Sequence, residues 1–134
     1  MVETSNTPLP TKLGIKAHSS LVLLHAPRNL VLEVDESVTV SRRARGPVDV
    51  VLAFFTRASA FEEELGRLSR LITHSGGLWI AWPKKSSGRV TSMTDHVVRD
   101  VALPLGLVDN KVCAIDETWT GVRLVWRLNR RSAL

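Results

Sequence analysis

Short, continuously apolar runs constrain the fold of this chain more than any other feature of its sequence. Residues 21–24 (LVLL), 50–55 (VVLAFF) and 78–82 (LWIAW) contain no charged side chain. Strands buried on both faces have this pattern, because neither side of such a strand meets water. Sheets of this kind are mostly parallel and are covered on both sides. The runs therefore predict an α/β domain with a parallel sheet at its centre.

A helix is expected after the predicted strand at 48–55, which contains the second run. Ser59 and Glu62 match a capping box, in which two side chains satisfy free N–H groups at a helix start. Apolar residues then recur at helical spacing, with charged residues between them; they are Phe61, Leu65, Leu68 and Ile72. Residues 74–77 (HSGG) are expected to end this helix, because glycine tolerates the left-handed C-cap conformation.

The C-terminal half of the chain predicts a second helix and a β-hairpin. Ser92 and Asp95 match another capping box, and residues 104–106 (PLG) are expected to close the helix that follows. Residues 108–115 and 121–128 then have the pattern of two strands joined by a short connection, which predicts a hairpin.

Strands that alternate with amphipathic helices imply parallel pairing through right-handed crossovers. A further short strand is expected at 38–40, so the predicted order is β-(short helix or loop)-β-β-α-β-α-β-β. The closing hairpin adds one antiparallel strand. We expect one three-layer, Rossmann-like α/β domain over residues 12–128, a flexible N-terminal arm at 1–11 and a C-terminal tail at 129–134.

Composition narrows the class of protein. With 134 residues and 44% hydrophobic content, the chain is long enough for one packed core. No apolar run approaches the roughly 18 residues of a membrane helix, and no signal pattern opens the sequence, so we expect a cytoplasmic location and no membrane partner. The single cysteine fits a reducing compartment. The net charge of +5 permits an acidic partner or nucleic acid, but many ordinary soluble domains carry a similar charge.

The predicted layout resembles that of class I methyltransferases. A mostly parallel sheet that ends in a helix and an antiparallel hairpin is typical of that superfamily. Residues 13–16 (LGIK) and 76–80 (GGLWI) are similar to segments that lead into its strands. The resemblance implies a truncated class I methyltransferase core that lacks one usual strand and its helix. In the superfamily's strand naming, the implied sheet order is 2-1-4-5-7-6.

A closer resemblance is to a bacterial family of domains of unknown function, the one numbered 3052. It is carried by residues 12–15 (KLGI), 82–88 (WPKKSSG) and 108–119 (VDNKVCAIDETW), and it covers about residues 12–127. The family implies a methyltransferase-like fold and brings no assigned activity.

The residues that a working methyltransferase needs for its cofactor are absent from the expected places. A glycine-rich turn should follow the first strand, where the backbone passes close to the cofactor. Residues 25–28 are HAPR instead, and no glycine lies between Gly14 and Gly46. A carboxylate should follow the second strand to accept hydrogen bonds from the ribose hydroxyls. Residues 41–43 are SRR. We therefore expect no ordinary use of S-adenosylmethionine, and no other cofactor is indicated.

Other catalytic patterns are also missing. The dinucleotide-binding, P-loop and nucleophile-elbow motifs do not occur. The histidines and Cys113 have no spacing typical of a metal site. Cys113 lies within an apolar strand, where an inert, buried thiol is the expected state.

The carboxyl edge of the sheet is where a ligand site is expected, because ligands of open α/β sheets bind there. Two segments should meet at this edge, one after the strand at 78–82 and the other within the hairpin. They supply the candidate ligand-binding residues Trp82, Lys84, Lys85, Asp116, Glu117 and Trp119. In one interpretation a lysine binds an anionic group while Trp82 or Trp119 forms an apolar wall. In the other, the opposite charges pair and fasten the hairpin. Trp79 and Trp126 are expected in the core.

Three functional hypotheses remain open at the level of sequence. The first is a non-catalytic binding or regulatory module that recognises a protein partner or a small anionic ligand at the Lys84/Asp116 rim. The second is an enzyme that acts on a small anionic substrate by acid–base chemistry with Lys84 and Glu117. The third is an accessory domain that binds nucleic acid through the basic cluster at 42–45 (RRAR).

Overall fold

The computed structural model describes residues 7–128. The helices and strands are, in chain order, α2 (Leu9–Lys12), β1 (Ser20–Leu24), β2 (Thr39–Ser41), β3 (Val48–Phe54), α3 (Ala58–Ser69), β4 (Ile72–Pro83), the 3₁₀ turn η1 (Lys85–Ser87), α4 (Asp95–Leu105), β5 (Leu107–Ala114) and β6 (Trp119–Trp126). Residues 9–12 are helical although they fall mostly in the predicted arm. The predicted tail, 129–134, and the first six residues of the arm lie outside the described residues. Within 7–128, no helix is long and apolar enough to cross a membrane.

The six strands form one sheet in the order β2-β1-β3-β4-β6-β5. The first four strands in this order are parallel to one another, and β6 runs antiparallel to both β4 and β5. The prediction of a mostly parallel α/β sheet with a closing antiparallel hairpin is confirmed. The order also matches the one implied by the methyltransferase resemblance.

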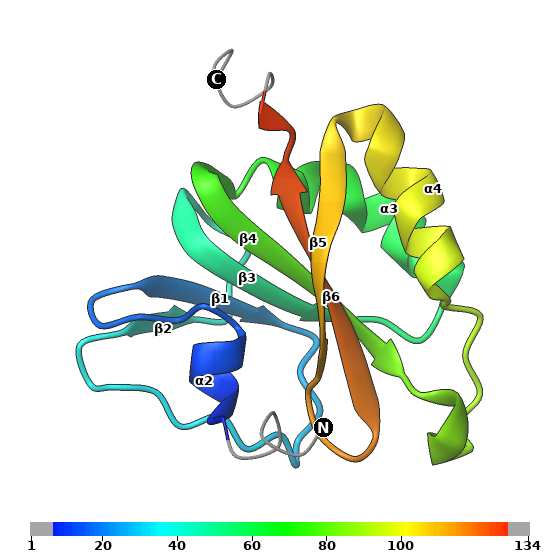
Figure 1. Cartoon of the computed structure of the whole chain (residues 1–134), viewed down its shortest axis with the longest axis horizontal. Coiled ribbons are helices and arrows are strands. Elements are labelled where there is room, and N and C mark those ends of the chain that lie inside the picture. Colours follow the sequence, from blue (N-terminus) through cyan, green and yellow to red (C-terminus); the bar gives the residue numbers. More distant parts are fainter. Residues whose placement is uncertain (1–6, 129–134) are drawn as a thin grey trace.

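The sheet separates two buried clusters, which define its faces. On the α3/α4 face, Phe61, Leu65 and Leu68 of α3 and Val98 and Ala102 of α4 pack against the strands. On the opposite face, which we call the α2 face, the covering layer is thinner. It consists of α2 with Leu13 and Ile15, and of apolar side chains from the irregular segment 25–38. Figure 1 shows α2 on one side of the sheet and α3 on the other.

Both predicted capping boxes are wrong, because each helix starts at a different residue from the one that the motif requires. Helix α3 begins at Ala58, so Ser59 lies inside its first turn and cannot cap it. The cap comes instead from a distant segment, since Ser92 Oγ accepts a hydrogen bond from the Ala58 N–H at 2.8 Å. Helix α4 is capped by Thr94, whose Oγ1 accepts from the Val97 N–H at 3.1 Å.

The end of α4 follows the prediction, whereas the end of α3 does not. Gly106 adopts a φ of 94° after α4, as a left-handed C-cap requires. Helix α3 stops at Ser69, and residues 72–77 belong to the start of β4. The reason is tertiary pairing: Ile72 lies opposite Val48 on β3, and the ladder resumes after a register shift. The glycines at 76 and 77 therefore serve the sheet and do not end the helix.

Candidate ligand-binding sites

The turn after β1 occupies the place where a methyltransferase would carry its glycine-rich loop. His25 takes a φ of 59°, in the left-handed region that non-glycine residues seldom adopt. Its Nε2 lies 3.2 Å from both carboxylate oxygens of Glu64 on α3. Its ring meets Phe55 edge-on, with centroids 5.5 Å apart. The histidine side chain thus joins the end of β1 to α3.

The residues that follow cover the α2 face and leave a small cavity. Ala26, Leu30 and Leu32 pack against the buried cluster of that face. Beside them lies a cavity of about 320 Å³ whose lining includes Arg28 and Arg42 and no carboxylate. Arg42 is the first residue after β2, where a methyltransferase would carry its ribose-binding carboxylate.

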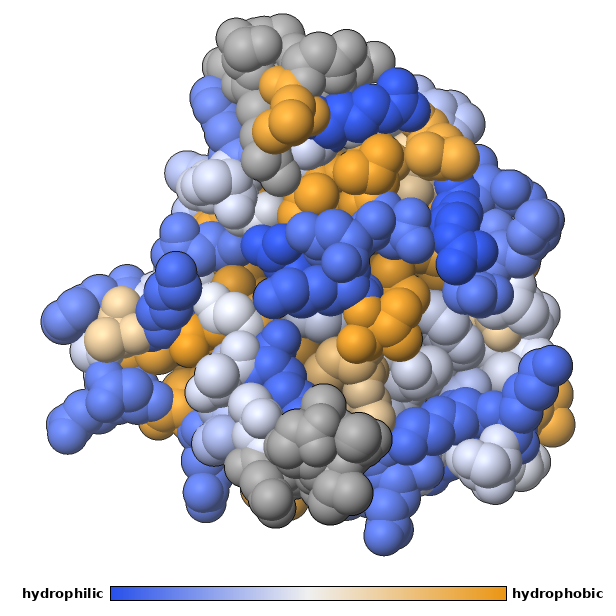
Figure 2. All heavy atoms as spheres, in the orientation of Figure 1, coloured by the Kyte–Doolittle hydropathy of each residue, from blue (hydrophilic) through white to orange (hydrophobic). Residues whose placement is uncertain are grey.

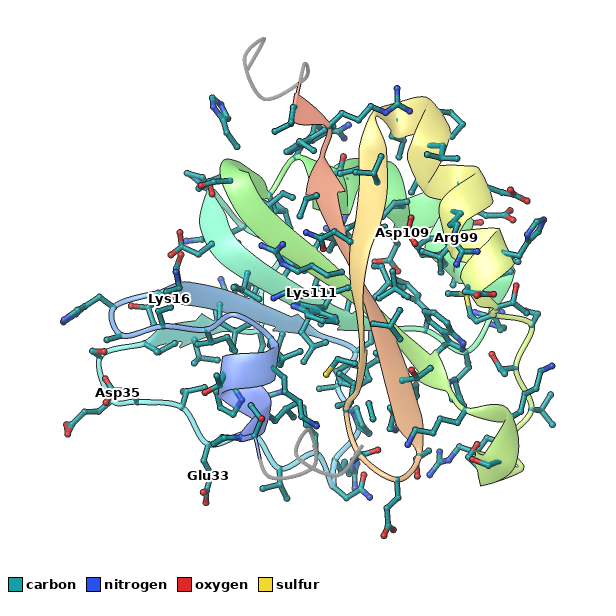
Figure 3. The ribbon with its side chains drawn as sticks, in the orientation of Figure 1. Lys16, Glu33, Asp35, Arg99, Asp109 and Lys111 are labelled. Carbon is teal, nitrogen blue, oxygen red and sulfur yellow. The ribbon has the colours of Figure 1, made fainter. Side chains whose placement is uncertain are left out.

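The acidic residues of this segment face away from that cavity. Figure 3 shows Glu33 and Asp35 projecting outward from the loop that precedes β2, and both are exposed. The carboxylate of Asp35 accepts hydrogen bonds from the hydroxyl and the N–H of Ser37, and these bonds lower its pKa. Asp35 therefore serves the local turn.

The structure brings the predicted rim residues to one edge of the sheet. Pro83 pairs with Trp119, and the Lys84 N–H donates to the Thr118 carbonyl at 2.8 Å. Asp116 Oδ1 accepts from the N–H groups of Thr118 and Trp119, each at 2.8 Å, which shapes the β5–β6 connection. Backbone pairing therefore joins the segment after β4 to the β5–β6 connection. Within residues 7–128, no ion pair links Lys84 or Lys85 to Asp116 or Glu117.

The four tryptophans all lie in the core. Trp79 and Trp126 were expected there, and they are 0% and 9% exposed. The rim tryptophans are buried as well, with Trp82 8% and Trp119 6% exposed. Trp119 meets Phe54 edge-on at 5.1 Å, and the Arg89 guanidinium lies 6.0 Å from its ring centroid. The rings of Trp82 and Trp119 therefore offer little surface to a ligand at the rim.

A basic cavity on the α2 face escaped the sequence reasoning. It has a volume of about 330 Å³ and lies at the amino ends of β1, β3 and β4. Its charged lining consists of four cations and one carboxylate: Lys12, Lys16, Lys111, Arg123 and Asp49. Figure 3 shows Lys16 and Lys111 on this face, and Figure 2 shows hydrophilic side chains across its middle, between hydrophobic patches. These residues come from separate segments, so no local motif signals them.

The structure also places Cys113, the possible metal ligands and the basic cluster at 42–45. Cys113 is half-buried at the end of β5, and its burial raises the pKa of its thiol. Among residues 7–128, no three histidine, cysteine or acidic side chains gather as a metal site would require. The basic cluster at 42–45 keeps its arginines exposed.

Several solved structures with a similar fold are methyltransferases. The chain is similar to the ribosomal protein L11 methylase of Lactobacillus delbrueckii subsp. bulgaricus, with a TM-score of 0.56, 9% identity and coverage of 89% of this chain and 75% of that one. It is also similar to a TehB-like SAM-dependent methyltransferase of Corynebacterium glutamicum, with a TM-score of 0.55, 9% identity and coverage of 84% and 82%.

Magnesium protoporphyrin IX methyltransferase of Synechocystis, solved with bound SAH, gives a TM-score of 0.51 at 14% identity over 67% of this chain. The chain spans about half of that enzyme, 51% of its length. Models of protein families give no match to the sequence, and curated proteins give none either. The protein therefore has a Rossmann-like, methyltransferase-like fold, and the similarity extends to the fold alone.

Proposed function

We propose that this protein is a non-catalytic binding module built on a methyltransferase-like fold, and that it does not take S-adenosylmethionine in the ordinary way. The observation that carries the proposal is the cavity after β1 and β2. Arg28 and Arg42 line it, and no carboxylate does.

The chemistry of the cofactor explains why this lining matters. S-adenosylmethionine carries a positive sulfonium, and its ribose hydroxyls need hydrogen-bond acceptors. Guanidinium groups are donors only and stay charged. Two of them beside the cavity would repel the sulfonium and leave the ribose hydroxyls without an acceptor.

The rim at the carboxyl edge is the recognition surface that we propose. Lys84 and Lys85 follow β4, and Asp116 and Glu117 lie in the adjoining β5–β6 connection. Lys85 and Glu117 are exposed, and the neighbouring tryptophan rings are buried. A surface with charges of both signs and no exposed aromatic wall suits a protein partner of complementary charge better than a small ligand. We also propose membership of the bacterial family 3052, which the segments at 82–88 and 108–119 support.

Titration of the protein with S-adenosylmethionine and S-adenosylhomocysteine tests the first part of the proposal. A ligand that binds only the native state must raise the melting temperature of the protein. We therefore expect no binding heat in isothermal calorimetry and no rise in melting temperature with either compound. The Arg42→Asp variant restores a carboxylate after β2 and serves as the comparison. Saturable binding by the natural sequence would refute the proposal.

Partner capture with two charge-reversed variants tests the second part. Lys84→Glu/Lys85→Glu should lose the proteins that the natural sequence retains, whereas Lys16→Glu/Lys111→Glu carries the same change in charge elsewhere and should keep them. If both variants lost the same proteins, net charge would explain the retention and the rim would not.

A further inference from the structure

We propose that the basic cavity on the α2 face binds a small phosphorylated compound. The cavity lies at the amino ends of the parallel strands, whereas the proposed rim lies at their carboxyl ends. The inference therefore goes beyond the proposed function and does not depend on it.

Two cations of the cavity lining, Lys111 on β5 and Arg123 on β6, lie side by side on neighbouring strands above the buried Trp79 of β4. Lys111 lies directly opposite Arg123, and Arg123 lies opposite Trp79, so all three side chains are on the α2 face. The Arg123 guanidinium crosses Gly77, where an added Cβ would lie 2.4 Å from Nε. Two positively charged side chains therefore border the same part of the cavity.

The opposite wall is held by a buried hydrogen bond. The indole N–H of Trp79 donates to the carbonyl of Leu13 at 2.9 Å, and this bond ties the end of α2 to the sheet. Lys12 is the last residue of α2. Lys16 follows the left-handed turn at Gly14, and its N–H donates to Ser19 Oγ at 3.0 Å. The backbone on this side is therefore fixed before any ligand arrives, which lowers the cost of binding.

The cavity has an excess of positive charge. Asp49 is the single carboxylate in its lining, and Asp49 Oδ2 already accepts hydrogen bonds from the N–H and the hydroxyl of Ser20, at 2.8 and 3.1 Å. Within residues 7–128, no ion pair joins Lys12, Lys16 or Lys111 to a carboxylate. The three lysines are thus available to a ligand.

The size and lining of the cavity indicate the class of ligand. A volume of about 330 Å³ lies at the small end of the roughly 300–1,000 Å³ range of ligand sites. Lysines bind phosphate as mobile point charges, and the hydroxyls of Ser19 and Ser75 border the same space. No aromatic side chain lines the cavity, whereas single-stranded nucleic acid is held by stacking on such residues. A compact phosphate ester fits these features better than a nucleic acid strand.

Binding of ribose 5-phosphate and of inorganic pyrophosphate tests the inference. Nitrogen-15 NMR spectra should show shifts of the amides of Gly14, Ser75 and Gly76 that saturate with either probe. Calorimetry gives the dissociation constants. Sulfate at equal ionic strength and a twelve-nucleotide DNA strand are the comparison ligands.

Two variants with equal loss of charge separate a site from a general effect. Lys16→Ala/Lys111→Ala should weaken binding about tenfold or more. Lys84→Ala/Lys85→Ala, at the other edge of the sheet, should leave it within about twofold. All four lysines are at least partly exposed, and thermal denaturation verifies that both variants fold.

Absence of saturable shifts in the natural protein would overturn the inference. Equal weakening by the two double variants would overturn it as well, because that result indicates attraction by net charge. Binding of DNA that is tighter than that of ribose 5-phosphate, with shifts of the same amides, would assign the cavity to nucleic acid and reject a small ligand.

Discussion

Replacement of Trp79 by phenylalanine should destabilise the protein and also disturb the basic cavity. The Trp79 side chain is fully buried, and its N–H donates to the Leu13 carbonyl at 2.9 Å. Phenylalanine keeps an aromatic ring but leaves this buried carbonyl without its donor, which costs about 1–3 kcal/mol. The smaller ring also loses about 40 Å³, which adds about 1 kcal/mol at about 24 cal/mol per Å³ of cavity. The expected loss of unfolding free energy is about 2–4 kcal/mol.

Urea denaturation of Trp79→Phe and of a matched variant, Trp126→Phe, measures this loss. Trp126 is 9% exposed, and its indole N–H has no hydrogen bond among the residues that the structure describes. The control therefore has the same change in volume without the lost hydrogen bond. We expect it to lower the free energy of unfolding by about 1 kcal/mol. In nitrogen-15 spectra, Trp79→Phe should shift the amides of Gly14 and Lys16, which Trp126→Phe should not. Equal destabilisation by the two variants would refute the role of the Trp79 hydrogen bond.

Three further predictions follow from single residues. Thr94→Ala removes the cap of α4 and should cost about 1 kcal/mol in urea denaturation, whereas Thr94→Ser should restore most of it. Gly106→Ala forces a side chain into a left-handed conformation and should lower the free energy of unfolding by about 1–2 kcal/mol. Gly66→Ala lies in the middle of α3 with open space at its Cβ and should raise it by about 1 kcal/mol. Urea denaturation of the two variants should therefore give changes of opposite sign. Burial raises the pKa of Cys113, so the rate of its alkylation should rise at a higher pH in the native protein than in the urea-unfolded chain; coincident pH profiles would contradict this.

Local apolar patterns were enough to predict three central strands of the sheet, β1, β3 and β4. The runs at 21–24 and 78–82 lie in β1 and β4, and residues 50–54 lie in β3, because side chains covered on both faces of a sheet are apolar. The order of strands and helices along the chain followed from these runs together with the helical and hairpin patterns, and the order within the sheet followed from the methyltransferase resemblance. Gly106 was identified as the end of α4 for a similarly local reason, the backbone conformation that a C-cap needs.

The helix starts could not be predicted in the same way. A capping box is a local motif, but Ser92 caps α3 from 34 residues away. The first turn of α3 was free to begin at Ala58 only because the segment after β4 returns to it. The early start of β4 likewise depends on a distant partner. Ile72 pairs with Val48 of β3, and this pairing places residues 72–77 in the sheet and not in α3.

The sequence predicted the rim at the carboxyl edge in part, and it did not predict the basic cavity. The approach of Lys84 to the hairpin was predictable, since parallel strands end at one edge of a sheet. The burial of Trp82 and Trp119 was not predictable, because it depends on which side chains pack over each face of the sheet. The basic cavity was beyond sequence reasoning altogether. Its cations are brought together by strand order, cross-strand register and the packing of α2, and each of these is a long-range contact. The sequence by itself determined the central strands and the two long helices, though not where each begins; only the tertiary structure decided which charges share a site.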